Sequence, residues 1–178
     1  MPRPWTVESR TPLVDHCYLT VTAERVRTGT GVVLDPFFTV RSADWVLAVP
    51  VRPDGRVVLV EQYRHGLGAV ARELPAGNVD AGEDPATAML RELQEETGYT
   101  AVGAYRELGT LWPEPSRCQA QATGYLVPVG QDPGPSAPTA DEDLAVVTAS
   151  WDELLAPDHA GICHGTQLAF LLLAARWR

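Results

Sequence analysis

The chain has 178 residues, 45% of them hydrophobic and 21% charged, and a formal net charge of −9 at pH 7. This length and composition predict one globular domain that is large enough for a proper core. We expect no membrane span and a cytoplasmic location, because no apolar run is long enough to cross a bilayer and the first residues lack a signal-peptide pattern. The acidic charge argues against a nucleic-acid partner.

The apolar pattern predicts an α+β order of elements. Strands are expected at residues 17–27, 31–40, 45–51, 56–62, 68–74, 101–111, 120–129 and 144–149. Residues 28–30 predict a hairpin turn between the first two strands, and residues 53–55 (Pro-Asp-Gly) predict another turn. Ser150 and Glu153 form a capping box for a short helix, and residues 166–177 predict a final amphipathic helix.

Cysteine and histidine residues give little functional signal. Cys17, Cys118 and Cys163 are widely separated and form no zinc-like pair, so we expect reduced thiols. His65 and His164 are expected at structural or surface positions rather than as ligands.

Residues 77–99 (GNVDAGEDPATAMLRELQEETGY) carry the most informative pattern. Asp84 and Pro85 suit the start of a helix, and Gly98 suits the residue just past its end. Between them, apolar residues recur at helical spacing: Ala86, Met89, Leu90 and Leu93. The segment therefore predicts a helix with one apolar face.

The same helix carries a group of acids. Glu92 and Glu96 are four residues apart and lie on one face, with Glu95 beside them. Like charges at this spacing cost an isolated helix about 0.2–0.5 kcal/mol per pair. Crowded carboxylate oxygens suit Mg²⁺ or Mn²⁺, which bind through a few carboxylates and substrate phosphates. The competing interpretation is a solvated, glutamate-rich helix face.

Residues 77–99 resemble the signature box of the Nudix hydrolases at every fixed position except the last, where Tyr99 replaces an aliphatic residue. Residues 61–64 (EQYR), residues 73–77 (ELPAG) and Pro115, sixteen residues after Tyr99, resemble the ADP-ribose pyrophosphatase branch of that family. The resemblance covers about residues 17–175. The resemblance includes too many charged residues at fixed positions to be a chance match.

The resemblance implies a fold and an assembly. Residues 45–178 would form a Nudix-type α/β/α sandwich with a mixed β-sheet, within the α+β class. Residues 1–44 would form an N-terminal β-hairpin segment. In enzymes of this branch such strands exchange between two subunits, so a homodimer is expected.

The resemblance also implies a metal site. The backbone carbonyl of Ala76 and the carboxylates of Glu92 and Glu96 would bind Mg²⁺ or Mn²⁺, with Glu95 as a further candidate ligand.

Other residues receive different roles from the resemblance. Glu83 and Arg91 would form a pair that holds the catalytic box together, and Arg64 would contact the substrate diphosphate. The alternative for Arg64 is a solvated cation at a strand end.

Further candidates concern the base of the substrate and the catalytic proton transfer. Trp45 and Trp112 could stack on a nucleobase or could belong to the core, and Pro115 could be only a loop proline. The resemblance implies a general base either within the box, where Glu95 is the candidate, or on a later loop. That loop would contain Glu142, in an acidic triplet after a Pro-rich segment, which could have a metal or base role. The alternative for that triplet is a solvated cap.

The resemblance and the box together predict a metal-dependent pyrophosphohydrolase that acts on a nucleoside diphosphate linked to another moiety. ADP-ribose, giving AMP and ribose 5-phosphate, is the first candidate. Sugar nucleotides such as GDP-mannose, dinucleotides such as FAD or NADH, and damaged nucleoside triphosphates are alternatives. The absence of an acid directly after Pro115 weakens the assignment of ADP-ribose.

Two other classes of protein share this fold. A non-catalytic ADP-ribose sensor is the alternative outside enzymology, although such proteins usually lose the box acids that this chain keeps. An isoprenoid isomerase would need a dedicated cysteine–glutamate pair, which the sequence does not identify.

Overall fold

The structure is a computed structural model that describes residues 1–137 and 143–178. The chain divides into two compact units. One unit comprises Met1–Asp44 and Trp112–Gln121, and the other comprises Trp45–Leu111 and Ala122–Arg178.

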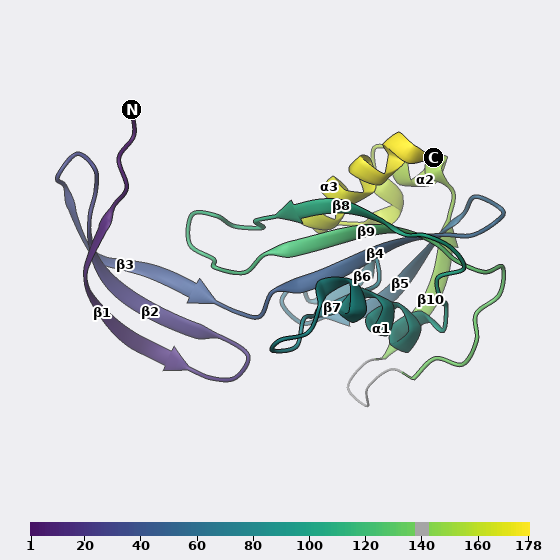
Figure 1. The fold of residues 1–178 in the computed structure, drawn as a ribbon, viewed down its shortest axis with the longest axis horizontal. Coiled ribbons are helices and arrows are strands. Elements are labelled where there is room, and N and C mark those ends of the chain that lie inside the picture. The colour runs from purple at the N-terminus through teal and green to yellow at the C-terminus, as the bar shows by residue number, and fades with distance from the viewer. Residues whose placement is uncertain (138–142) are drawn as a thin grey trace. The chain divides into compact units, whose positions relative to one another are not determined.

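The first unit contains an antiparallel sheet in the order β1-β2-β3 (Figure 1). Its strands are β1 (Thr6–Asp15), β2 (Thr20–Arg27) and β3 (Val33–Arg41). The sequence predicts the last two as a hairpin, and the structure adds β1 to them. Every residue of β1 is exposed, and only Glu24 and Val26 are buried in the three strands. The sheet therefore has little core of its own.

The second unit contains a seven-stranded mixed sheet. Its main path runs β10-β5-β4-β9-β8, while β6 pairs with β5 and β7 pairs with β4. Only the β4–β9 pairing is parallel among these described strands. The strands are β4 (Trp45–Val51), β5 (Val57–Arg64), β6 (Ala69–Glu73), β7 (Ala76–Asn78), β8 (Arg106–Leu111), β9 (Ala122–Pro128) and β10 (Leu144–Ala149).

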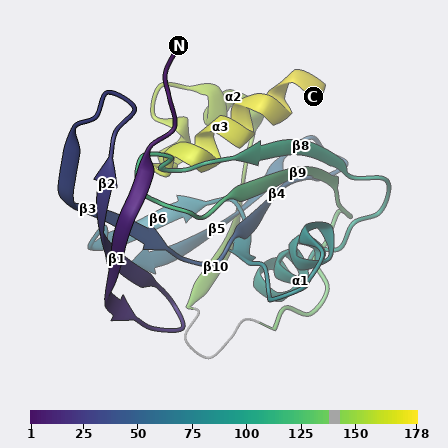
Figure 2. The same ribbon diagram turned by 60° about the vertical axis from the view of Figure 1, so that its left-hand side comes forward.

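Helices cover both faces of this sheet, α1 on one side and α2 with α3 on the other (Figures 1 and 2). The helical elements are α1 (Pro85–Thr97), α2 (Trp151–Leu155), η1 (His159–Gly161), α3 (Gly165–Ala174) and η2 (Ala175–Trp177). The predicted α/β/α sandwich of the α+β class is thereby confirmed.

Strand alternation explains the two layers of core. In β4, Val46 and Ala48 pack in the cluster that contains Met89 and Leu93 of α1. Their neighbours Leu47 and Val49 point the other way, into the cluster that contains Phe170 and Leu171 of α3. Strand β4 is therefore buried on both faces and forms the centre of the unit.

Several boundaries differ from the sequence expectation. Strand β8 begins at Arg106 rather than at residue 101, because Ala101 makes only an isolated bridge to Val129. The expected final helix ends at Ala174 and continues as one 3₁₀ turn. Strand β2 begins at Thr20 rather than at residue 17. Within residues 1–137 and 143–178, no helix is both long enough and apolar enough to cross a membrane.

Candidate active site

Helix α1 begins and ends at the residues that its capping pattern predicts. The side chain of Asp84 accepts a hydrogen bond from the backbone N–H of Thr87 at 3.0 Å, and Pro85 is the first helical residue. At the other end, Gly98 adopts a left-handed backbone with φ of 72°, and its N–H donates to the carbonyl of Gln94 at 2.8 Å. These caps fix the position of the acids on the helix.

Glu92 and Glu96 both lie against strand β7. Glu96 is buried, at 4% exposed, and its Oε2 accepts a hydrogen bond from the backbone N–H of Ala76 at 2.9 Å. The Glu92 carboxylate occupies the space above Gly77, where a Cβ atom would stand 2.0 Å from its carboxyl carbon. Position 77 therefore accepts a side chain only if Glu92 moves.

Arg91 connects three of the acids. Its Nε and Nη2 donate to the two oxygens of Glu83 at 3.1 and 2.9 Å. Its Nη1 donates to Glu92 at 2.7 Å and to Glu95 at 3.3 Å. The Glu83–Arg91 contact thus ties the loop before α1 to the middle of the helix.

The charges of this pair reinforce each other. The Arg91 side chain, followed by the backbone N–H of Asp80, lowers the pKa of Glu83 below its ordinary value. Glu83, followed by Glu92, raises the pKa of the Arg91 guanidinium against the effect of burial. Both groups are therefore held in their charged forms.

The oxygen atoms of these residues have the chemistry of ligands for a divalent cation. Carboxylates and a backbone carbonyl are the hard oxygen ligands that Mg²⁺ and Mn²⁺ prefer. No group of three or more His, Cys, Asp or Glu side chains in the described part of the chain is arranged around a common metal position. Glu92 and Glu95 contact Arg91 instead, and Glu96 contacts Ala76. The assignment of metal ligands therefore stays a prediction.

A pocket of about 960 Å³ opens beside these groups within the second unit. Its volume lies in the range of small-molecule sites, about 300–1,000 Å³. Its walls come from β4 to β7, the turn between β5 and β6, the box helix and the start of α3. They include Trp45, Gln62, Arg64, Glu73, Ala76, Gly77, Arg91, Glu92, Glu96, Cys163, His164 and Gln167. The pocket thus joins residues from both ends of the unit's sequence.

The family model for the NUDIX domain matches residues 42–164. The chain belongs to the Nudix hydrolase family. The matched range contains the whole box and Arg64, together with the strands that line the pocket.

Individual relatives agree with this assignment. The chain is similar to an ADP-ribose pyrophosphatase of Bacillus subtilis, with 45% identity over 56 residues, 32% of this chain and 30% of that protein. It is also similar to an ADP-ribose pyrophosphatase of Mycobacterium tuberculosis, with 29% identity over 154 residues, 78% of this chain and 72% of that protein. The chain thus spans less than a third of the length of the first of these relatives.

A solved structure shows the same fold. It is described as "Crystal structure of ADP compounds hydrolase" and superposes with a TM-score of 0.81, over 99% of this chain and 95% of that chain. Its sequence identity is 22%, so the likeness concerns the Nudix fold alone.

The described residues that the sequence predicts as substrate contacts belong to both units of the chain. Arg64 and Trp45 both lie on the pocket wall, together with the box acids. Trp112 and Pro115 belong to the first unit, in the segment Trp112–Gln121. Glu142 lies outside the described residues. The roles of these five residues in substrate binding or catalysis stay predictions.

One part of the pocket has no signal in the sequence. His164 lies on its wall with its ring edge-on to Trp45, the ring centroids being 5.5 Å apart at 72°. Cys163 and Gln167 line the same pocket. These residues follow the box by more than sixty positions, and only the docking of α3 on the sheet brings them to the site. No local spacing could have indicated this.

The segment before the undescribed residues is bonded to the box helix. The N–H of Gly134 donates to the carbonyl of Gly98 at 2.8 Å, and the N–H of Ala137 donates to the carbonyl of Glu95 at 3.0 Å. Residues 134–137 therefore lie at the C-terminal end of α1.

Proposed function

We propose that this Nudix protein is a Mg²⁺- or Mn²⁺-dependent pyrophosphohydrolase that cleaves a nucleoside diphosphate linked to another moiety, with ADP-ribose as its first substrate. The observation that carries this proposal is that Arg64 shares one pocket with Glu92 and Glu96 of the box. A cation for the diphosphate and acids for a metal thus face the same space. The names of the two pyrophosphatase relatives support the choice of ADP-ribose.

The residues would divide the reaction among them. Glu92, Glu96 and the Ala76 carbonyl would hold the divalent cation. When bound, the cation supplies positive charge beside the diphosphate and makes water easier to deprotonate. Arg64 would orient the diphosphate oxygens and stabilise the charge that develops on them. Either Glu95 or Glu142 would accept the proton of the attacking water.

The rest of the pocket would bind the remainder of the substrate. The Trp45 and His164 rings form an aromatic part of the wall, in the same pocket as the acids. Aromatic faces bind nucleobases and the apolar faces of sugars by stacking and contact. Water would attack one phosphorus, the P–O–P bond would break, and ADP-ribose would give AMP and ribose 5-phosphate.

A substrate panel tests this proposal. The purified protein is incubated with ADP-ribose, GDP-mannose, FAD or NADH, in the presence of Mg²⁺ or Mn²⁺, and the products are separated by anion-exchange chromatography. We expect AMP and ribose 5-phosphate from ADP-ribose at the highest kcat/KM. Tight binding of ADP-ribose without cleavage would favour the alternative of a non-catalytic ADP-ribose sensor. The proposal would be refuted if the protein neither binds nor cleaves any of these compounds.

The Glu96→Gln variant is the matching loss-of-function test. It keeps the volume of the side chain and an oxygen that can accept from Ala76, so the melting temperature should hold. Its kcat should fall below a tenth of the wild-type value, which corresponds to about 1.4 kcal/mol in the barrier. Glu107→Gln removes the same charge at an exposed position of β8 and should leave kcat unchanged.

A further inference from the structure

Glu73, at the end of β6, is a buried acid on the wall of the pocket. Its side chain is only 4% exposed, whereas the side chain of Arg64 is 44% exposed. Arg64 binds it with two prongs: Nε donates to Oε1 at 2.9 Å and Nη2 donates to Oε2 at 2.5 Å. A carboxylate this deeply buried requires such pairing. The two parallel bonds also fix the plane of the guanidinium.

Gln167 holds Glu73 from the α3 side. It is 2% exposed, and its Oε1 accepts a hydrogen bond from the backbone N–H of Leu74 at 2.7 Å. Because Oε1 is the acceptor there, the amide NH₂ is directed to Glu73, and Nε2 donates to Oε2 at 3.4 Å. The hydrogen-bonded series Gln167–Glu73–Arg64 is thus anchored on the backbone N–H of Leu74 in the core.

The register of the hairpin shows what this anchor does to Arg64. In the β5–β6 pairing, Arg64 is opposite Ala69, at the turn, whereas Glu73 is opposite Val60. Four strand residues, about 13 Å, separate Arg64 from the partner of Glu73. The Arg64 side chain therefore runs back along the hairpin, away from the turn, to reach Glu73. An arginine at a hairpin end with no such partner would sample many rotamers in solvent.

We propose that Glu73 and Gln167 are positioning residues that hold Arg64 at the place where it meets the substrate diphosphate. This inference rests on the proposed function, which assigns the diphosphate contact to Arg64. A guanidinium has five N–H donors, so the two bonds to Glu73 are compatible with donation to a phosphate. An arginine that is fixed beforehand loses less conformational freedom when the substrate binds.

If Glu73 acts through its charge, a neutral substitution should have one effect on turnover; if it acts by positioning Arg64, the effect should be the opposite. Glu73→Gln removes a negative charge from the pocket, which by charge alone would favour an anionic diphosphate. If Glu73 positions Arg64, the same substitution weakens turnover, because the two-pronged bond becomes a single weaker one. The sign of the change therefore separates the two explanations.

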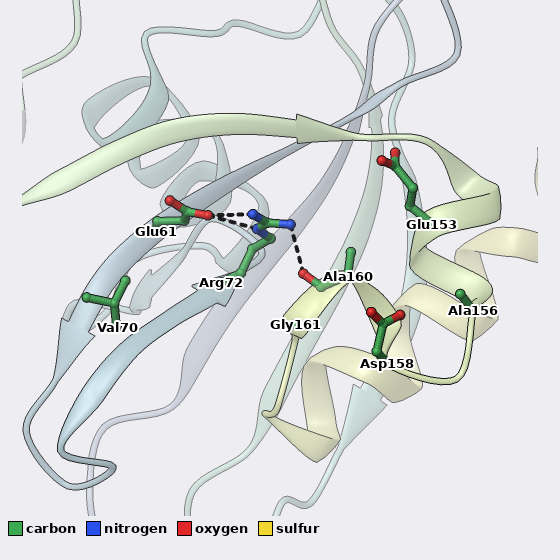
Figure 3. A pocket seen from close by; sticks show the side chains of 8 residues that line it. All are labelled: Glu61, Val70, Arg72, Glu153, Ala156, Asp158, Ala160 and Gly161. Atoms are coloured by element: carbon green, nitrogen blue, oxygen red, sulfur yellow. Dashed lines mark hydrogen bonds and ion pairs between the residues drawn. The ribbon is translucent and has the colours of Figure 1, made fainter.

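The same hairpin offers a matched control on its other face. There Arg72 donates through Nε and Nη2 to Glu61 at 3.0 and 2.6 Å, and through Nη1 to the carbonyl of Ala160 at 2.9 Å (Figure 3). The pair uses the same residue types in the same two strands, but it faces a different pocket, of about 630 Å³. Glu61→Gln therefore weakens an arginine–glutamate pair of the same hairpin at a residue outside the pocket of Arg64.

The experiment is a double-mutant cycle on ADP-ribose hydrolysis. Glu73→Gln should lower kcat/KM at least tenfold, and Glu61→Gln should change it less than twofold. In an Arg64→Ala background, Glu73→Gln should add less than twofold, because there is no longer an arginine to position. Gln167→Leu should give a smaller loss that also disappears in that background. A Glu73→Gln loss that persists without Arg64, or an increase in kcat/KM, would overturn the inference.

A second readout requires no turnover. The ¹⁵N NMR signal of the Arg64 Nε–H group, identified by its absence in Arg64→Ala, should be sharp and exchange slowly in the wild type. It should broaden or vanish in Glu73→Gln and persist in Glu61→Gln. An unchanged signal in Glu73→Gln would refute the anchoring.

The two hypotheses fail in different ways. If the wild type hydrolyses ADP-ribose and Glu73→Gln does so equally well, the positioning fails and the proposed function stands. If the wild type hydrolyses none of the panel, the proposed function fails. The double-mutant cycle is then repeated with the Kd of ADP-ribose, measured by calorimetry, in place of kcat/KM. An unchanged Kd in Glu73→Gln would reject the positioning role of Glu73 as well.

Discussion

Gly77 is constrained by its neighbour Glu92 more than by its own backbone. A methyl group at position 77 would meet the Glu92 carboxyl carbon at 2.0 Å. That carboxylate is the far end of a flexible side chain, so Gly77→Ala should displace it at a cost in unfolding free energy of less than about 1 kcal/mol. If Glu92 binds metal, the variant should lose at least tenfold in Mn²⁺ affinity, about 1.4 kcal/mol.

The control for Gly77→Ala is Gly165→Ala, where a methyl group would meet no atom within 4 Å and the backbone φ is not positive. Titration calorimetry with Mn²⁺ and denaturant unfolding measure the two effects separately. Wild-type Mn²⁺ affinity in Gly77→Ala would remove Glu92 from the list of ligands.

Glu142 and Glu95 are the two candidates for the general base. If Glu142 accepts the proton, Glu142→Gln should lower kcat by roughly 10²–10⁴ and abolish the low-pH limb of the rate profile, with little change in metal requirement. Glu95→Gln should then act through metal affinity and recover partly in excess Mg²⁺. Glu95 contacts Arg91 at 3.3 Å, so it can influence the box without meeting the water. Near-wild-type kcat in Glu142→Gln would assign the base to Glu95.

Spacing within one helix predicts some site residues and misses others for a physical reason. Glu92 and Glu96 share a face because the helix repeat puts them there, and the structure places both against β7. Glu73 and Gln167 are 94 positions apart, and their contact depends on how α3 docks on the sheet. Long-range packing of this kind leaves no periodic pattern in the sequence. The sequence therefore does not indicate that Glu73 contacts Arg64 and Gln167.

The Glu83–Arg91 pair joins the loop before α1 to the helix, and the stabilisation that the pair provides should depend on pH. Arg91 holds the pKa of Glu83 below its ordinary value of 4.5, so the native state favours the ionised acid. The stabilisation is then fully present above about pH 4.5 and is lost as the pH falls through the lower, native pKa.

Urea unfolding of the wild type and Glu83→Gln over a range of pH measures this dependence. The difference in unfolding free energy should be largest near neutral pH and should shrink below about pH 4.5. A difference that grows as the pH falls would contradict the assigned direction of the Glu83 pKa.

Elements were predictable where capping and periodicity agree. Helix α1 has an N-cap, a C-cap and an apolar face, and it runs from Pro85 to Thr97 as its pattern predicts. Strand β1 has no alternation to recognise, because all ten of its residues are exposed and it contains Pro12. Strand β7 has three residues directly after Pro75, too few for a periodic signal.

The first unit exposes an apolar surface on its three-stranded sheet. Two rows of cross-strand neighbours lie on one face, because Val21 and Ala23 are two residues apart in β2. The rows are Val14–Val21–Val40 and Thr11–Ala23–Phe38. Phe38 is 42% exposed and Val14 is 45% exposed. A sheet with so few buried residues needs a cover for its apolar side chains.

We propose that a second copy of the chain supplies this cover. Light scattering at micromolar concentration should give about twice the chain mass of 19.3 kDa. Phe38→Glu places a charge in the apolar rows and should shift the protein to the mass of one chain, because a buried, unpaired charge opposes association. Thr30→Glu adds the same charge in the exposed hairpin turn and should leave the dimer intact. A single-chain mass for the wild type would show that these strands have no partner copy, and a dimer that survives Phe38→Glu would place its interface on another surface.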